Sequence, residues 1–409
     1  MTAQRALPCV LALFLAIVLH GQEKSLHLAI GDPARKDREA PVVLDGITDT
    51  RTGEVVTPAE LAKRLAGARL VLVGESHTDM DFHRAELRVL QELVRAGRPV
   101  LVGLEMYPYP EQRFLDGWVD GRLTEEAFLQ GSRWYENWGY NWLYYRDIFL
   151  FAREHKLRMF AVNAPRDVVT AVRKKGFKDL TPEEAAHIPT GIDTSSPEHR
   201  TLFKSFFAAG GDPLHSGMSE AQWDSMIAAQ ATWDATMAFN AVKALQEHGG
   251  RDTVMVVLAG SGHVVYGLGI QRQAARGFDG RPFQDKIATV VPVNVRDPEG
   301  HEVKTVQASY ADFVWGLPAQ TDPLYPSLGL STNPVEGEKA LKVILVSEGT
   351  PAGKAGAQVG DVIVSLDGTA VPDKETLNRL VAAKRWGDEA VLTVKRGSET
   401  KTLRIALRR

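Results

Sequence analysis

Two apolar runs that each lead into a Gly-x-x-His motif constrain the fold of this chain most strongly. Leu70–Val73 leads into Gly74–His77, and Val254–Ala259 leads into Gly260–His263. A strand that is buried on both faces of a parallel sheet has such an unbroken apolar sequence. Ligands in parallel α/β folds bind where the carboxyl ends of the strands meet their loops. The two motifs therefore predict a site at one edge of a parallel sheet.

Two further apolar runs end in polar residues that suit the same edge. Val100–Leu104 leads into Glu105, and a run that starts at residue 158 leads into Asn163. Parallel strands end at a common edge, so side chains that are far apart in the sequence can meet there. We expect His77, Glu105 and His263 to converge in one pocket.

Helical patterns alternate with these strands. Residues 79–96 carry apolar side chains at three- and four-residue steps and stop before Gly97, which predicts an amphipathic helix over the sheet. Residues 107–150 are dense in aromatic side chains and are read as a helical insertion. The predicted fold class is therefore α/β, with a mainly parallel sheet flanked by helices and a helical insertion, plus a small β-rich domain at the C-terminus.

The composition is that of a folded protein with more than one core. The 409 residues are 44% hydrophobic and 24% charged, which excludes disorder throughout and, at this length, predicts two domains. The formal net charge of -3 provides no basic surface of the kind that nucleic-acid binding requires. We therefore expect no nucleic-acid partner.

Residues 1–21 have the order of a secretory signal peptide. Arg5 precedes the apolar run Val10–Leu19, which is too short to span a bilayer. This order predicts export to the periplasm or cell envelope. Because Leu19 is bulky where a small residue is preferred for cleavage, an uncleaved N-terminal anchor is the alternative. The single cysteine, Cys9, lies in this segment, so the mature chain would have no thiol for a disulfide or a metal site.

The remaining sequence divides at two segments that contain turn-forming residues. Residues 22–40 read as a linker, and so do residues 319–326, which contain two further prolines. These segments bound a large domain at 41–318 and a C-terminal domain at 327–409.

The C-terminal domain carries a series of short motifs. They are the loop Ser327–Leu330, the stretch Gly349–Gly356, the segment Val359–Ile363 and the turn Leu366–Gly368. This series resembles a PDZ domain of the bacterial type. The resemblance implies that loop amides capture the terminal carboxylate of a protein or peptide that adds to the sheet as a strand.

The residues that the PDZ resemblance implies for peptide contact lie in the loop and in the following helix. They are Leu328, Gly329, Leu330, Leu377 and Leu380. Pro334 lacks a backbone N–H near the groove strand, which weakens the case for an added strand. The alternative is a PDZ domain used for dimer or domain contacts.

Two imidazoles and one carboxylate suggest a metal site in the large domain. His77, Glu105 and His263 form a ligand set that suits a catalytic Zn or Fe ion with open positions for water and substrate. Glu75 or Glu105 would then act as the catalytic base of a metal-dependent hydrolase. The three residues form no local motif, so this prediction depends on the fold bringing them together.

A longer series of motifs covers about residues 65–295. It comprises Gly74–His77 with His83, Gly103–Met106, Trp138–Trp142 with Tyr145–Arg146, Asn163–Arg166, Gln230–Asp234 and Gly260–His263. This series resembles the ChaN family of haem-binding, iron-regulated proteins in the Tiki superfamily. The resemblance implies an α/β domain, haem binding at a dimer contact, and a role in haem or iron uptake and handling at the cell envelope. Superfamily relatives instead imply a metal-dependent peptidase or hydrolase that uses His77, Glu105 and His263.

The ChaN resemblance also implies further site residues. Those around the pocket are His83, Arg146, Asn163, Arg166, Gln230, Trp233 and Asp234. Haem ligation in the family uses a tyrosine, and Tyr107 and Tyr109, with the adjacent Met106, are the candidates because they follow Glu105. A phenolate ligand favours ferric haem. No Cys-x-x-Cys-His motif is present, which excludes covalent attachment.

Three hypotheses therefore follow from the sequence. The first is an exported haem-binding protein whose PDZ domain binds protein C-termini, as a monomer or a homodimer. The second is a metal-dependent hydrolase, and the third is a non-enzymatic interaction scaffold. The metal and haem content of the purified chain distinguishes among them.

Overall fold

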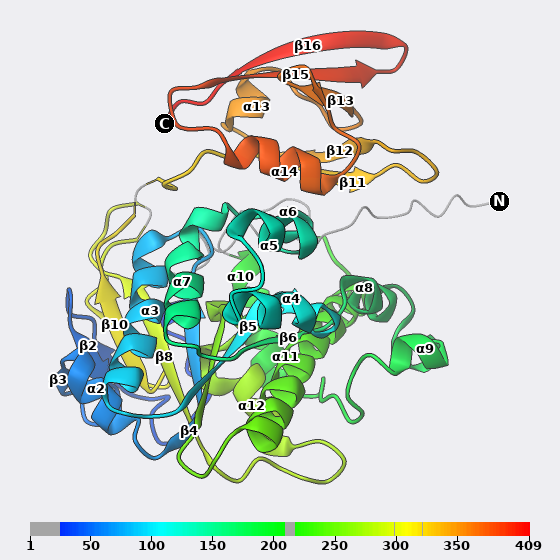
Figure 1. Cartoon of the computed structure of the whole chain (residues 1–409). Coiled ribbons are helices and arrows are strands. Elements are labelled where there is room, and N and C mark those ends of the chain that lie inside the picture. Colours follow the sequence, from blue (N-terminus) through cyan, green and yellow to red (C-terminus); the bar gives the residue numbers. More distant parts are fainter. Residues whose placement is uncertain (1–24, 209–216, 298, 321) are drawn as a thin grey trace. The chain divides into compact units, whose positions relative to one another are not determined.

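The computed structural model describes residues 25–208, 217–297, 299–320 and 322–409 (Figure 1). Within these ranges the chain forms two compact units. The α/β unit comprises residues 25–132 and 145–320, and the C-terminal unit comprises Arg133–Tyr144 together with Asp322–Arg409. The predicted signal peptide, residues 1–21, lies outside the described residues. In the described ranges, no helix combines the length and the apolar character needed to cross a membrane.

The α/β unit contains an eight-stranded sheet in the order β3-β2-β10-β8-β4-β7-β5-β6 (Figure 1). The strands are β2 (Ile47–Asp49), β3 (Val55–Val56), β4 (Ala68–Glu75), β5 (Val100–Pro108), β6 (Met159–Asn163), β7 (Val254–Gly260), β8 (Lys286–Asn294) and β10 (Phe313–Leu317). All neighbours from β10 to β6 are parallel, and only β2 and β3 are antiparallel additions at one edge. The four apolar runs of the sequence are thus β4, β5, β6 and β7, side by side, which confirms the predicted fold class.

Helices flank the sheet, as the alternation of apolar runs and helical patterns in the sequence predicts. Those of the α/β unit are α2 (Pro58–Arg64), α3 (Met80–Arg95), η2 (Tyr109–Glu111), α4 (Gln112–Val119), α5 (Glu125–Gly131), α7 (Arg146–Glu154), α8 (Arg166–Lys175), η4 (Phe177–Asp179), α9 (Pro182–Ala185), α10 (Pro197–Ala208), α11 (Glu220–His248), η5 (Ser261–His263), η6 (Val265–Gly267) and α12 (Ile270–Arg276). The Asp79 side chain accepts a hydrogen bond from the Asp81 N–H and begins α3. The longest helix, α11, begins with a capping box between Ser219 and Gln222.

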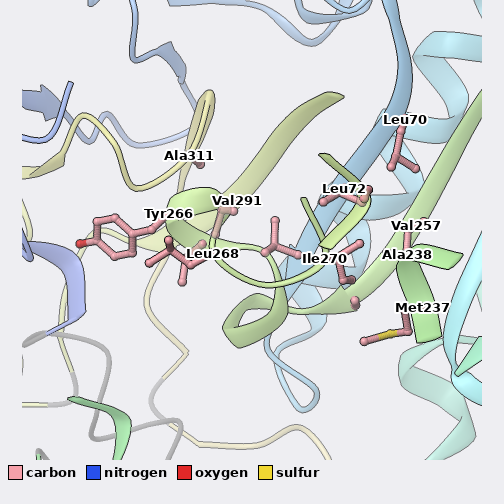
Figure 2. Packing of buried hydrophobic residues seen from close by; sticks show 14 of the residues in the cluster. Leu70, Leu72, Met237, Ala238, Val257, Tyr266, Leu268, Ile270, Val291 and Ala311 are labelled. Atoms are coloured by element: carbon pink, nitrogen blue, oxygen red, sulfur yellow. The ribbon is translucent and has the colours of Figure 1, made fainter. Parts of the chain in front are cut away.

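The main hydrophobic core lies between the sheet and α11 with α12. Figure 2 shows Leu72, Val257 and Ile270 in this cluster, and all three side chains are completely buried. Ala-rich turns of α11, such as that around Ala238, allow the helix to lie close to the strands. This packing fixes α11 against the sheet and therefore fixes the polar side chains that α11 carries.

The segment predicted as a linker at residues 22–40 is packed in its described part, which corrects that prediction. Leu26 and Ile30 belong to the main core, and the Tyr266 hydroxyl donates to the Ser25 carbonyl and accepts from the Leu28 N–H. The short strand β1 (Glu39–Pro41) pairs with β9 (Thr305–Gln307). The segment's mixed charge misled the interpretation, because the buried charge of Arg35 is compensated by partners that include distant residues of the chain.

Arg35 shows how that charge is accommodated. Its guanidinium pairs with Asp32 and Asp312 and donates to the Thr50 hydroxyl and the Ala311 carbonyl. A buried cation is stable only when its donors are satisfied in this way. The N-terminal segment is therefore part of the folded unit.

The C-terminal unit has an antiparallel sheet in the order β11-β12-β13-β15-β16, with β14 paired to β13. Its elements are α6 (Trp134–Asn137), η3 (Trp142–Tyr144), β11 (Leu330–Pro334), β12 (Leu341–Val346), α13 (Pro351–Lys354), β13 (Val362–Leu366), β14 (Thr369–Ala370), α14 (Lys374–Ala382), β15 (Glu389–Arg396) and β16 (Glu399–Ala406). Leu341, Ile363 and Leu392 form the centre of its own core. The predicted helical insertion at 107–150 is thus shared between the two units, because Arg133–Tyr144 belongs to this one.

A Tyr266→Phe substitution tests the packed state of the N-terminal segment. It removes both bonds of a buried hydroxyl, so we expect the free energy of unfolding to fall by about 1–3 kcal/mol. Urea unfolding followed by tryptophan fluorescence measures the change. Trypsin should also cut faster at Arg35 and Lys36 in the variant. Unchanged stability and unchanged cleavage would show that the segment is dispensable.

Candidate functional site

Three neighbouring strand ends form the centre of the site. Glu75 at the end of β4 lies opposite Gly260 at the end of β7 in the parallel register. The Gly260 N–H donates a 2.6 Å hydrogen bond to Glu105 Oε2, and Glu105 comes from the adjacent strand β5. The sheet register therefore brings both carboxylates to the same edge.

His77 reaches this edge across Gly260. Its Nδ1 lies 2.6 Å from Glu75 Oε1. A Cβ added at Gly260 would lie 3.0 Å from His77 Cε1, 3.4 Å from its Nε2 and 3.5 Å from Glu105 Oε2. The absence of a side chain at Gly260 thus gives the imidazole and the Glu105 carboxylate room to approach each other.

His263 lies between two carboxylates. Its Nε2 is 3.3 Å from Glu105 Oε1, and its Nδ1 is 2.6 Å from Asp234 Oδ1 on α11. Gln230, one turn earlier on α11, places Nε2 3.0 Å from the same Nδ1. The structure therefore places His77, Glu105 and His263 together, with Gln230 and Asp234 beside them.

Electrostatics favour an imidazolium between two carboxylates. Burial acts to lower the pKa of His263, but the charges of Glu105 and Asp234 outweigh it and raise this pKa to about 10. Burial acts to raise the pKa of Glu105, whereas the charge and hydrogen bond of His263 lower it below its usual value. Both carboxylates are thus paired with the same imidazolium.

A second buried network lies on the other side of Glu75. His83 Nδ1 is 2.8 Å from Glu86 Oε2, and the Tyr145 hydroxyl donates to Glu75 Oε1 at 3.1 Å. The His83 and Tyr145 rings are in contact, with centroids 4.2 Å apart. Burial raises the pKa of Glu86 to about 7 despite the opposing effect of His83. This network holds Glu75, and through it His77, in place.

Three members of these networks were not among the predicted site residues. Glu86 follows His83 by three positions, a helical spacing that signals the pair. Tyr145 lies in a recognised motif, but its contact with Glu75 depends on tertiary structure. His199, whose Nε2 lies 3.4 Å from Asp234 Oδ2, comes from α10, where the sequence offers no signal.

The contacts among the predicted metal ligands are hydrogen bonds and ion pairs. No group of three or more His, Cys, Asp or Glu side chains within the described ranges is arranged to hold a metal ion. Buried oxygens without a hydrogen-bond partner do lie here, namely Glu75 Oε2, Gln230 Oε1 and Asp234 Oδ2. The present geometry thus gives no support to a metal-dependent hydrolase. That hypothesis, with Glu75 or Glu105 as the catalytic base, stays a prediction from the sequence.

The other predicted pocket residues divide between the site and the surface. The Asn163 side chain donates to the Glu105 carbonyl at 2.8 Å, and the Trp233 ring centroid lies 6.4 Å from that of His263. Arg146 instead pairs with Glu125 at 2.9 Å, and Arg166 is exposed at the start of α8. Arg146 thus pairs outside the buried network, and Arg166 lies at the surface.

The predicted haem ligands differ in their surroundings. Met106 and Tyr107 are buried, and the Tyr107 hydroxyl is 2.9 Å from Ser132 Oγ among the rings of Phe128 and Phe149. Tyr109 is only half-buried, and its hydroxyl lies 2.6 Å from His187 Nδ1. Of the three, Tyr109 presents the donor atom that suits ferric iron in a position nearer to solvent.

The predicted peptide-binding residues lie around β11 and α14. Leu328 and Leu377 are buried in the core of the C-terminal unit, and Leu330 and Leu380 pack partly exposed against it. Gly329 has φ of +75°, and a Cβ there would lie 2.2 Å from Thr350 Cβ. This loop thus requires glycine. Among the described strands, β11 pairs only with β12, which leaves its other edge for an added strand.

The geometry defines an α/β protein with imidazole–carboxylate pairs at its strand ends, joined to a second unit with an antiparallel sheet. The sequence profile described as haem-binding uptake, Tiki superfamily, ChaN matches residues 61–273, and that of the PDZ domain matches residues 326–407. Because the first match covers more than half of the chain, the protein belongs to the ChaN haem-binding family of the Tiki superfamily. Its C-terminal unit contains a PDZ domain.

A solved structure gives the same fold for the larger unit. The structure described as cofacial haem binding to ChaN of Campylobacter jejuni is 19% identical, with a TM-score of 0.51. The match covers 66% of this chain and 95% of that one. At this identity the likeness supports the fold alone.

Two curated proteins share shorter segments. A probable periplasmic serine endoprotease, DegP-like, from Pseudomonas fulva is 45% identical over 65 residues, which are 16% of this chain and 14% of that protein. A protein of the same description from Rhizobium meliloti is 30% identical over 166 residues, 36% of this chain and 32% of that protein. The chain thus spans less than a third of the length of these relatives.

The pairing of Asp234 with His263 can be measured by a double-mutant cycle. Breaking a buried ion pair leaves one charge uncompensated, so Asp234→Asn should destabilise the protein by about 3–5 kcal/mol. Together with His263→Gln it should give a coupling energy of about 1–3 kcal/mol in urea unfolding. The matched control is the more exposed Arg146–Glu125 pair, for which Arg146→Gln and Glu125→Gln should couple by about 1 kcal/mol or less. Equal coupling in both cycles would contradict a buried, charged pair.

Proposed function

We propose that this protein is exported and binds ferric haem through Tyr109, in haem or iron handling at the cell envelope. The observation that carries the ligand assignment is the half-buried Tyr109 hydroxyl, 2.6 Å from His187 Nδ1. Membership of the haem-binding ChaN family supports haem as the bound group. Phenolate oxygen is a hard donor that suits ferric rather than ferrous iron.

The surroundings of Tyr109 fit the role of an axial ligand. It follows the end of β5, a rigid strand, and the bond to His187 orients the phenol. Their rings lie with centroids 5.9 Å apart. The alternative ligand Tyr107 has its hydroxyl enclosed by the aromatic core, so binding there would require that core to open. When bound, haem would supply an iron centre, and the Tyr109 oxygen would ligate it at the end of β5.

The sequence and the relatives support export and a role at the envelope. Residues 1–21 have the order of a signal peptide, and the curated relatives that share segments with this chain are described as periplasmic. The role in haem or iron handling follows from the family description, which is haem-binding uptake. The contact between two copies that the family resemblance implies is also part of this proposal.

The PDZ domain is proposed to bind the C-terminus of a partner protein. The open edge of β11, the glycine-dependent loop at Gly329 and the partly exposed Leu330 and Leu380 support this assignment. A strand added at β11 would gain main-chain hydrogen bonds, and an apolar terminal residue would contact the leucines. Such a module would recruit a protein partner to the haem-binding unit.

A hemin titration followed by absorbance tests the ligand. Tyr109→Phe removes the donor oxygen, so the tyrosinate charge-transfer band should disappear and Kd should rise by about tenfold or more, the equivalent of 1.4 kcal/mol. Tyr107→Phe is the matched control, because it removes a core hydroxyl, and it should retain the spectrum. Loss of the band only in Tyr107→Phe would reverse the assignment. Metal analysis of the same sample reports bound zinc or iron, and light scattering reports the dimer.

A fluorescent decapeptide that ends in Val with a free carboxylate tests the PDZ domain in the full chain. Leu380→Glu places a charge beside the proposed groove and should weaken binding by about tenfold or more, as measured by polarisation. Val359→Glu is the control, because Val359 is 66% exposed in the same domain and outside the groove. Equal binding of the C-terminally amidated peptide would contradict recognition of the carboxylate.

A further inference from the structure

The C-terminal unit contains a segment that is remote in the sequence from the PDZ domain. Arg133–Tyr144 belongs to this unit together with Asp322–Arg409. Its helix α6 packs against α14, the helix that borders the proposed peptide groove. The helix α14 of the PDZ domain therefore packs against a segment that lies far earlier in the same chain.

Hydrogen bonds join the segment to α14. Asn378 Nδ2 donates to the Tyr135 carbonyl at 2.8 Å, and the Glu136 N–H donates to Glu375 Oε2 at 2.8 Å. The Asn141 side chain donates to the Ala382 carbonyl at 3.1 Å. The contacted positions of α14 are three and four residues apart, so they form one stripe along the helix.

This stripe is distinct from the face of α14 that packs on the PDZ core. Leu377, Leu380 and Val381 belong to the core cluster or pack against it. Glu375 and Asn378 lie on the other side of the helix, at helical angles away from these residues. The segment thus contacts the side of α14 that carries Glu375 and Asn378, which we call the outer side. These bonds do not involve the opposite side, where Leu380 borders the proposed groove.

Aromatic contacts secure the end of the segment. The Tyr144 ring packs edge-on against Tyr325, with centroids 5.0 Å apart, and the Tyr144 hydroxyl accepts from the Tyr325 N–H at 3.2 Å. Trp386, just after α14, donates to the Pro323 carbonyl at 2.8 Å. The segment is thus held both along α14 and at the start of the PDZ domain.

We propose that the outer side of α14 is a docking surface for Arg133–Tyr144, and that this contact couples the PDZ groove to the strand-end site. The covalent chain provides the link for this coupling, because Tyr144 precedes Tyr145, whose hydroxyl donates to Glu75. A peptide bound between β11 and α14 would contact the same helix that carries the stripe on its outer side. The coupling, but not the docking, rests on the proposed peptide binding.

Hydrogen exchange of the full chain tests the docking. Asn378→Asp replaces the donor to the Tyr135 carbonyl with a negative oxygen, so exchange of the 133–144 amides should rise by about tenfold or more while the two cores stay protected. Ser398→Asp adds the same charge at an exposed site of the PDZ domain and should change nothing. Glu375→Gln keeps an acceptor and should retain protection. Equal exchange at 133–144 in all four proteins overturns the docking.

Circular dichroism and the Tm of each variant establish that it is folded. Should Asn378→Asp fail to fold, Asn378→Ala removes the same donor without adding charge. In this variant we expect exchange at 133–144 to rise, but by less than the change of about tenfold expected for Asn378→Asp. Unchanged exchange in Asn378→Ala would count against the docking in the same way.

The peptide ending in Val separates coupling from peptide binding. Added to the natural chain at saturation, it should change the exchange of 133–144 and of Tyr145, and the change should be lost in Asn378→Asp. Binding by polarisation without any change in exchange overturns the coupling. If the peptide does not bind, the proposed PDZ function fails, and the docking is judged by the Asn378 variants alone.

Discussion

The Glu105 carboxylate connects the parts of the strand-end site, and the arrangement of the other residues depends on it. One oxygen accepts the Gly260 N–H, and the other lies 3.3 Å from His263 Nε2. Because Glu105 is buried, it requires these partners to remain charged. The partners come from β7 and from the turn that follows it, so the parallel register of β5 with β7 is a condition for the site. A shift of that register would separate the carboxylate from the imidazole and leave both uncompensated.

The sequence predicts this framework well because the framework depends on local patterns. Unbroken apolar runs identify the four central strands, and parallel order then places Glu105 near His263 without further knowledge. The sequence predicts the contacts of side chains from helices less well. Glu86 is a charged residue on an amphipathic helix, and such residues are usually solvated, yet it is completely buried against His83. His199 lies on α10, where no motif of the sequence marks a site residue, so its contact with Asp234 was not predicted.

Misinterpretations of the sequence have a common physical cause, which is compensation by residues far away in the chain. Charge at residues 22–40 suggested a solvated linker, whereas Arg35 is satisfied by Thr50 and Asp312 and belongs to the fold. Aromatic density at 107–150 suggested one insertion. In fact Tyr107 packs in the core of the α/β unit, whereas Tyr144 contacts Tyr325 in the C-terminal unit. Local composition cannot distinguish these environments, because it records neither the partner nor its position.

The closed network at the strand ends bears on where a large ligand can bind. Each imidazole there already contacts a carboxylate, as His77 does with Glu75 and His263 does with Asp234. A ligand that took Nδ1 of His77 or of His263 would have to replace a buried, charge-assisted bond, whose disruption costs about 3–5 kcal/mol. Tyr109 imposes no such cost, because its single bond is between a neutral phenol and an imidazole near the surface, worth about 0.5–1.5 kcal/mol. The energetic difference supports the proposed iron ligation at Tyr109 and a structural role for the imidazole–carboxylate pairs, which hold the strand ends in place.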